Sequence, residues 1–297
     1  MKNSIKGVSA ILLSGLFFGS YGLWAKLIGS SLGDFYQTWT RMVLISAILL
    51  PIGFATKSFI RVKKRDIKWF AIVTLSGAAT FAPYFYAFNH LAIGTATLLF
   101  YAALTITIYI VGKLFLKEKM TLVKLASLII ALVGLSLIFT ISFGQGLLIP
   151  ALAAIFAGSA GGCEVAFTKK ISGSYSSVQI TTILFLVSLV LHLPLSLLLG
   201  ETQVIPNFTQ PWFAQIGYAL VQVGAFFFVV IGYNHLEASI AAILGLGEIL
   251  VAVAIGILLF GEALTGSVIL GGLLIIIAGI LPNMPQKIWQ RYLWSNC

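Results

Sequence analysis

Glu248 is a single carboxylate inside a long apolar run, GLGEILVAVAIGILLFG, at residues 245–261. It lies about twelve residues past the nearest predicted loop, or ~18 Å along a helix that rises roughly 1.5 Å per residue. An ionisable side chain at such a depth in a membrane is costly and usually faces a cavity or the interior of a helix bundle. We therefore expect Glu248 to be the counter-charge of an amine or cation, or a proton site. The structural alternative is a protonated carboxyl group that hydrogen-bonds a neighbouring helix.

Two further charged side chains fall within apolar segments. Arg41 follows Asp34 by seven residues, so the two share a helical face. This pattern fits either a link between the two side chains or a guanidinium group that binds a substrate carboxylate. Glu164 precedes Lys169 and Lys170 by about one helical turn, so a pairing with these lysines competes with a functional role.

Lys26 and His192 are weaker candidates. Lys26 is close enough to the end of its segment for the ammonium group to snorkel to the membrane surface. His192 precedes Pro194 inside an apolar segment, and histidine is the side chain whose charge changes near neutral pH. We take Glu164, Lys26 and His192 as candidate coupling or gating residues.

A stripe of polar side chains and several aromatic side chains complete the set of candidate site residues. In QPWFAQIGYALVQVGAF, at residues 210–226, Gln215, Tyr218 and Gln222 share one helical face and either line a cavity or join two helices. Trp212 and Trp24 lie near span ends, where aromatic side chains often form a belt at the membrane surface. The candidate substrate-binding residues are Glu248, Arg41, Gln222, Tyr218, Tyr101, Tyr84, Trp24 and Tyr21.

The elements that must position these residues are predicted to be membrane-spanning helices. The chain of 297 residues is 60% hydrophobic and 9% charged, whereas soluble domains carry roughly 25% charged residues. Continuous apolar runs favour helices over barrel strands, in which apolar and polar residues alternate. We predict ten spans, over approximately residues 5–29, 34–56, 68–88, 92–114, 121–141, 146–168, 177–199, 211–233, 238–260 and 265–283.

The basic residues predict the orientation of these spans. Of the eighteen Lys and Arg residues, all but Lys26 and Arg41 fall in the termini, in loops or at the adjoining span ends on one side of the predicted bundle. Because positively charged loops stay in the cytoplasm, both the N-terminus and the C-terminus are predicted to be inside. The same distribution accounts for the net charge of +10 without a nucleic-acid partner.

The two halves of the chain resemble each other. YAFNHLAIGTATLL at residues 86–99 aligns with IGYNHLEASIAAIL at 231–244, and FFGSYG at 17–22 aligns with FAGSAG at 156–161. Each half has five predicted spans, so the second half enters the membrane from the opposite side, as in inverted-repeat transporters.

This symmetry defines the predicted domain organisation, an all-α integral membrane fold of two inverted five-helix repeats. We place the first repeat at residues 5–141, the second at 146–283 and a cytoplasmic C-terminal tail at 284–297. Glu248 has no acidic counterpart in the first repeat, where the aligned residue is Ala103.

Each half also runs from a span into a Glu-x-x-Thr turn, at Glu118 and Glu262. Together with the paired halves, this pattern resembles the EamA-type drug/metabolite transporters over about residues 7–282. In that family a proline usually follows the first Glu of the span-9 motif, but Ile249 stands there in this chain, and Thr105 replaces the corresponding proline of the first half. No proline therefore supplies a kink at these positions.

The resemblance implies a secondary transporter whose pathway lies between spans 1–4 and 6–9. The segments ASLIIALVGLSLIF of span 5 and VILGGLLIIIAGIL of span 10 carry no charge, and these two spans are expected to face lipid or the second copy of a homodimer. Close packing, and the sliding surface of a rocking motion, are expected where small residues recur four apart, at Gly15 and Gly19 and at Ala154, Gly158 and Gly162.

These features predict a multi-pass carrier of the inner (plasma) membrane that moves a small polar metabolite, with a proton as a candidate coupling ion. Glu248 and Arg41 suit the two ends of an amino-acid-like zwitterion, and export follows from the resemblance. The alternative substrates are sugars, nucleosides or other neutral metabolites, bound by the Gln and Tyr side chains. An alternative of another class is a non-transporting scaffold or lipid scramblase, in which the polar groups only join helices.

Enzymatic chemistry is not expected. The chain has no phosphate-binding loop with its lysine and no His or Cys cluster with the spacing of metal ligands. We therefore predict no metal, no cofactor and no catalytic residues.

Overall fold

A computed structural model describes residues 2–91, 93–139, 147–261 and 263–283, and these residues form helices and connecting loops without a strand. The apolar runs of the sequence become helices because a backbone in lipid must satisfy its own hydrogen bonds. The α-helices are α1 (Lys2–Gly19), α2 (Tyr21–Ile28), α3 (Asp34–Ala55), α4 (Ile67–His90), α5 (Ile93–Leu114), α6 (Leu122–Ile138), α7 (Leu148–Thr168), α8 (Ser177–Leu198), α9 (Gln210–His235), α10 (Ala238–Gly245), α11 (Gly247–Phe260) and α12 (Gly266–Ile280).

The helices lie where the sequence places its spans. Within the described residues, seven helical segments are long and apolar enough to cross a membrane, and α6 and α12 are shorter apolar helices. Two of the seven segments, Ser4–Ile28 and Ala238–Phe260, each contain two consecutive helices. The total of ten crossings and the inward position of the termini remain predictions.

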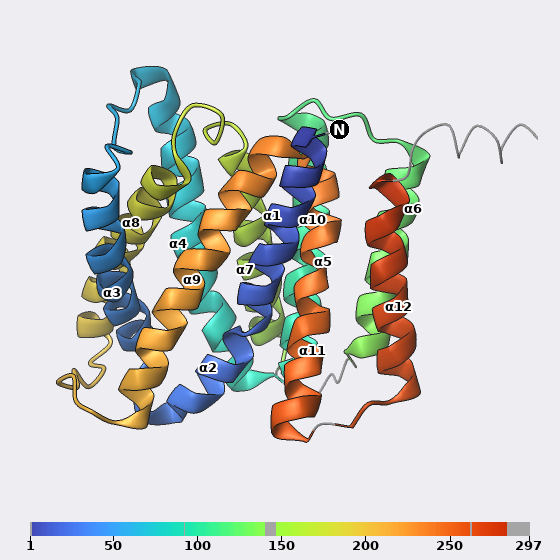
Figure 1. The fold of residues 1–297 in the computed structure, drawn as a ribbon. Helices are drawn as coiled ribbons and strands as arrows, with labels where there is room; N and C mark the ends of the chain where they lie inside the picture. Colours follow the sequence, from blue (N-terminus) through green and yellow to red (C-terminus); the bar gives the residue numbers. More distant parts are fainter. Residues whose placement is uncertain (1, 92, 140–146, 262, 284–297) are drawn as a thin grey trace, which may run out of the picture.

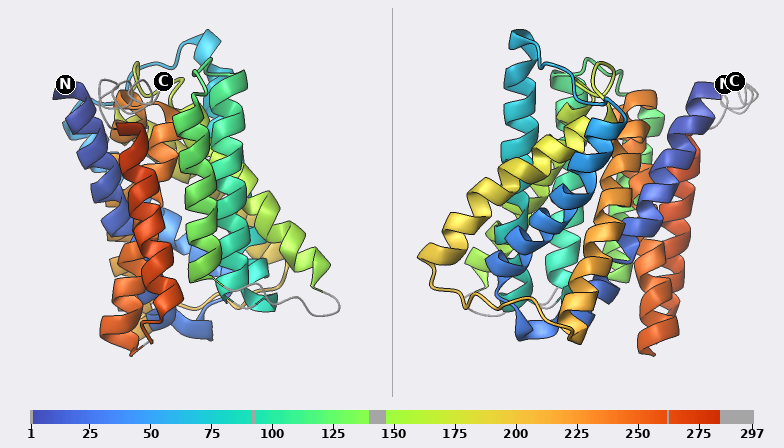
Figure 2. Two further views of the ribbon diagram at one scale, coloured as in Figure 1. Left: turned by 90° about the vertical axis from the view of Figure 1, so that its right-hand side faces the viewer. Right: turned by 60° about the vertical axis from the view of Figure 1, so that its left-hand side comes forward.

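The two halves of the chain are interlocked. α4 and α5 of the first half pack against α7 of the second, and α9 and α11 of the second half pack against α1 of the first. α3 pairs with α8 in the same way, and α6 pairs with α12 at the edge of the bundle (Figures 1 and 2). Each helix described here therefore finds its main partner in the other half of the chain.

Small residues permit the closest of these contacts, as their spacing predicts. A Cβ atom on Gly19 of α1 would lie 2.6 Å from the backbone oxygen of Glu248 in α11. A Cβ atom on Gly158 of α7 would lie 2.2 Å from the backbone oxygen of Phe100 in α5. Real Cβ atoms essentially never come this close, so the two helix pairs depend on glycine.

Spans 1 and 9 are not single helices, which corrects the expectation of one continuous helix over 5–29 and over 238–260. Span 1 breaks at Ser20, between α1 and α2, and span 9 breaks at Leu246, between α10 and α11 (Figure 1). At the first break the Ser20 hydroxyl donates to the Phe17 carbonyl, 2.7 Å away, in competition with the helical pattern. At the second break Leu246 stands between Gly245 and Gly247, two residues of low helix propensity.

The equivalent spans of the other half are continuous. Gly158 and Ser159, which align with Gly19 and Ser20, lie inside the unbroken α7, and Thr105 lies inside the unbroken α5. The break in span 9 needs no proline, since Ile249 occupies the usual proline position. The two broken spans pack against each other, because α11 contacts both α1 and α2.

Candidate functional site

Glu248 lies in the first turn of α11, directly after the break in span 9. Its side chain is half-buried, and the Tyr101 hydroxyl of α5 hydrogen-bonds its carboxylate. The partial positive charge of a helix N-terminus stabilises a nearby anion. The broken helix thus gives a carboxylate in the middle of span 9 both a hydrogen-bond donor and a favourable dipole.

Arg41 is the cationic group of the same region. It lies in α3 and is 1% exposed, with its guanidinium carbon 4.0 Å from the centre of the Tyr218 ring of α9. Its Nε and Nη1 atoms have no hydrogen-bond partner among the described residues. Buried donors of this kind are normally satisfied, so Arg41 presents two N–H groups suited to an anionic ligand.

Tyrosine side chains lie around both Arg41 and Glu248. The Tyr21 ring at the start of α2 meets the Tyr218 ring at 4.7 Å in an edge-to-face contact. The Tyr21 hydroxyl is buried without a hydrogen-bond partner among the described residues and lies within electrostatic range of both Arg41 and Glu248. Tyr84 of α4 and Tyr101 of α5 lie within range of Glu248 as well.

The polar side chains of α9 do not all have the same role: one joins two helices, and another is a candidate binding group. The Gln215 side-chain amide donates to the Gln37 carbonyl and to Thr40 Oγ1, the latter 2.9 Å away, so it joins α9 to α3. Gln222 is 1% exposed, and its Oε1 atom accepts no hydrogen bond from the described residues. Gln222 therefore remains a candidate binding group. Gln215 joins two helices through its amide N–H groups, although its Oε1 atom, like that of Gln222, has no partner among the described residues.

We define the central cluster as the side chains that these contacts and electrostatic interactions link. Five helices supply them: α2, α3, α5, α9 and α11, with Tyr84 of α4 beside them. The cluster consists of Arg41, Tyr218, Tyr21, Tyr101, Tyr84 and Glu248.

Two predicted substrate or gating residues at the ends of spans lie outside the central cluster. Trp24 packs on Gly217 of α9, where a Cβ atom would lie 2.2 Å from its ring. Lys26 is exposed, with its ammonium group 3.7 Å from the centre of the Phe260 ring. Trp212 is 6% exposed and packs near Tyr36, so its assignment to a membrane-surface belt is wrong.

The two other predicted coupling residues are buried. His192 is 2% exposed, its Nδ1 atom lies 2.7 Å from the Ser188 carbonyl, and its ring lies beside Phe35 and Phe81. Glu164 is 6% exposed and forms no ion pair with Lys169 or Lys170 within the described part of the chain. Of the two alternatives for Glu164, the pairing with these lysines is therefore not found among the described residues.

The comparison with protein families decides the identity of this bundle. The profile described as the EamA-like transporter family matches residues 5–140 and again residues 146–283. The chain belongs to the EamA-like transporter family. This is a family of membrane transporters and not of enzymes, and the two matched repeats confirm the resemblance seen in the sequence.

Solved structures share the fold of this EamA-like transporter. One of them, described only as "Crystal structure of protein", superposes with a TM-score of 0.81, covering 96% of this chain and 99% of that chain at 17% sequence identity. At this identity the likeness concerns the fold alone. A comparison with curated proteins found no match.

One carboxylate of the EamA-like chain has a role that its position in a turn did not indicate. Glu118, in the turn after α5, accepts hydrogen bonds from the backbone N–H groups of Ala238 and Ser239, at 2.5 and 3.2 Å. It thereby caps the N-terminus of α10 across the two repeats. Lys169, just beyond α7, lies 3.8 Å from the same carboxylate; burial lowers the pKa of Lys169, and the charge of Glu118 partly offsets this.

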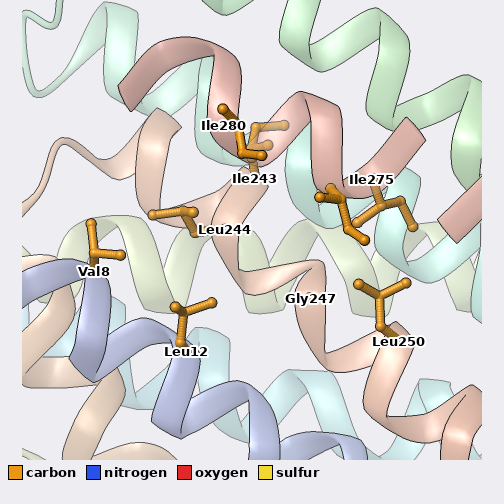
Figure 3. A pocket seen from close by; sticks show the side chains of 10 residues that line it. Val8, Leu12, Ile243, Leu244, Gly247, Leu250, Ile275 and Ile280 are labelled. Carbon is orange, nitrogen blue, oxygen red and sulfur yellow. The ribbon is translucent and has the colours of Figure 1, made fainter. Parts of the chain in front are cut away.

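An aliphatic cavity lies apart from the central cluster. It has a volume of about 460 Å³ and lies between α1, α10, α11 and α12. Figure 3 shows that aliphatic side chains surround it. Its lining offers no polar side chain for a metabolite and consists of Val8, Leu12, Ile243, Leu244, Gly247, Leu250, Ile275, Ile276, Gly279 and Ile280.

Proposed function

We propose that this transporter is a secondary carrier that exports small zwitterionic metabolites of the amino-acid class across the inner membrane by alternating access. The observation that carries the proposal is the pair of opposite charges, Arg41 and Glu248, within electrostatic range of one tyrosine hydroxyl, that of Tyr21. The outward direction and the membrane follow from the resemblance to the drug/metabolite transporters and from the charge distribution of the loops.

Arg41 would bind the substrate carboxylate. A guanidinium group with two unpartnered N–H donors matches the geometry of a carboxylate, and the Tyr218 ring fixes the plane of the guanidinium. Charge-assisted hydrogen bonds in a buried site are about twice as strong as neutral ones.

Glu248 would bind the substrate ammonium group. Its carboxylate accepts one hydrogen bond from Tyr101 and has lone pairs left for a second donor. Because Glu248 begins α11, a movement of α11 against α10 would move this anion, and discontinuous helices are the elements that carry binding sites in many secondary transporters.

A thermal-shift comparison of related ligands tests this assignment on detergent-purified protein. Ligands that bind the native state raise its apparent melting temperature. We expect an amino acid to raise the melting temperature, and its carboxyl-amidated and N-acetylated analogues, which each lack one charge, to raise it much less. Equal shifts with the three compounds would contradict the zwitterion site.

Neutral metabolites are a second candidate substrate class, because the Oε1 atom of Gln222 is buried without a partner among the described residues. A sugar or nucleoside hydroxyl would donate to this atom. If Gln222→Ala weakens transport more than Glu248→Gln does, the neutral class is favoured over the zwitterion.

A further inference from the structure

Glu164 is a buried carboxylate that the proposed substrate site does not use. It lies in α7, and its carboxyl group is seated against Gly77 of α4. A Cβ atom on Gly77 would lie 2.8 Å from the carboxyl carbon of Glu164 and 2.6 Å from a methyl group of Leu184. The glycine thus provides the space for the carboxyl group between two packed helices.

No opposite charge compensates this group in the described part of the structure. Within the described residues its carboxylate forms no ion pair and accepts no hydrogen bond. Lys169 instead donates to the Leu236 carbonyl, and Lys170 lies 5.4 Å from the centre of the Trp69 ring.

The titratable groups around Glu164 are tyrosines. The hydroxyl groups of Tyr21 in α2 and Tyr233 in α9 lie within electrostatic range of it. The titratable groups of the other helices that pack nearby interact elsewhere: Tyr84 of α4 and Tyr101 of α5 with Glu248, Tyr109 of α5 with the Lys124 carbonyl, and His192 of α8 with Arg41.

We propose that Glu164 is the proton-binding residue that couples substrate transport to a proton gradient, an inference that rests on the proposed carrier function. An unpaired carboxylate in this apolar contact is costly, whereas the protonated acid is neutral. The packed arrangement of α4 and α7 therefore favours the protonated form. Loss of the proton favours an arrangement in which water reaches the carboxylate, so the two helices must separate at Gly77.

The two carboxylates of the bundle then have different tasks. Glu248 has a hydrogen-bond partner in Tyr101, lies in the first turn of α11 and is partly exposed. We assign it to the substrate ammonium group, whose positive charge would stabilise the carboxylate once the substrate is bound. Glu164 has none of these stabilising features and exchanges a proton. For export, one proton taken up by Glu164 on the outside is released inside for each substrate molecule that leaves, and Tyr21 lies within range of both carboxylates.

Transport assays in proteoliposomes distinguish loss of proton coupling from loss of substrate binding. Glu164→Gln, which mimics the protonated acid, is expected to retain exchange of labelled for unlabelled amino acid without a gradient and to lose accumulation driven by an imposed pH gradient. Glu164→Asp, which keeps a titratable carboxyl group, is expected to restore gradient-driven accumulation. Gradient-driven accumulation by Glu164→Gln at the wild-type rate would overturn the proposal.

An infrared pH titration in nanodiscs gives a readout that needs no substrate. Wild-type protein is expected to show a carbonyl band of a protonated carboxyl group that titrates with pH, and this band should disappear in Glu164→Gln and persist in Glu248→Gln. A band that persists in Glu164→Gln would overturn the assignment. If the wild-type protein exchanges no tested metabolite, the carrier function fails, while the infrared result still decides whether Glu164 binds a proton.

Discussion

Arg41 shows most clearly at the scale of single residues what the central cluster is suited to bind. Its guanidinium group is 1% exposed and stacks on an aromatic ring, and two of its N–H groups have no partner among the described residues. Such a group does not stabilise the folded state. Buried charges without partners cost free energy, and replacing them with uncharged groups is often neutral or stabilising. Such a cost is typical of a binding residue.

Arg41→Gln tests this reasoning. We expect the substrate KM to rise about tenfold to a hundredfold, because a charge-assisted hydrogen bond contributes ~1.5–3 kcal/mol. The apparent melting temperature without substrate should stay the same or rise. Arg41→Lys keeps the charge but loses the planar stack, so its KM should be intermediate. A variant with wild-type KM and a lower melting temperature would show that Arg41 is structural.

At the scale of helices, the proposed transport movement depends on how the two broken spans, 1 and 9, pack against each other. α1 and α11 approach each other at Gly19, whose Cα faces the backbone of Glu248. The contact is tight enough that any side chain on Gly19 must push the two helices apart. The position of Glu248 relative to Tyr21 therefore depends on one glycine contact.

Gly19→Ala is expected to lower the transport rate strongly and to destabilise the fold by about 1–3 kcal/mol, the usual cost of overpacking. Gly22→Ala is the matched control, because a Cβ atom on Gly22 meets nothing within 4 Å. Denaturation in detergent measures stability, and exchange in proteoliposomes measures transport. Equal behaviour of the two variants would contradict the importance of the α1–α11 contact.

The helices show how much of the fold could be predicted from the sequence. Apolar runs of the sequence mark helices within a few residues of their observed bounds. The structure adds the side-chain caps Thr121, Ser176 and Thr265, which the sequence analysis did not identify. The breaks were not predictable, because they occur without proline and depend on a local bond such as that of Ser20 to Phe17. The charged residues of the central cluster could be chosen by their depth in a membrane, but their shared contact with tyrosines required the three-dimensional structure.

At the scale of the whole molecule, the interlocked halves determine which parts can fold alone. Every helix pair that dominates the packing joins one repeat to the other, including α3 with α8 and α6 with α12. The cap of α10 by Glu118 spans the two repeats as well. Such long-range contacts, more than a hundred residues apart, cannot be read from either half of the sequence.

Separate expression of the two halves, cut within residues 140–146, tests this arrangement. Neither half alone is expected to accumulate in the membrane, since each would expose the small-residue and polar faces that the other covers. The two halves expressed together should copurify and bind the same ligands as the intact chain. A stable single half that purifies as a folded species would contradict the interlocked fold.

The measurement that most directly tests the carrier proposal is counterflow in proteoliposomes loaded with an unlabelled amino acid and exposed to the same labelled amino acid. We predict that wild-type protein accumulates the label transiently, and that Glu248→Gln accumulates at least about tenfold less, as expected for the loss of one charge-assisted contact. Lys26→Gln, at an exposed position outside the central cluster, should behave as the wild type. Equal accumulation by wild type and Glu248→Gln, or no exchange of any amino acid by the wild type, would contradict the zwitterion carrier.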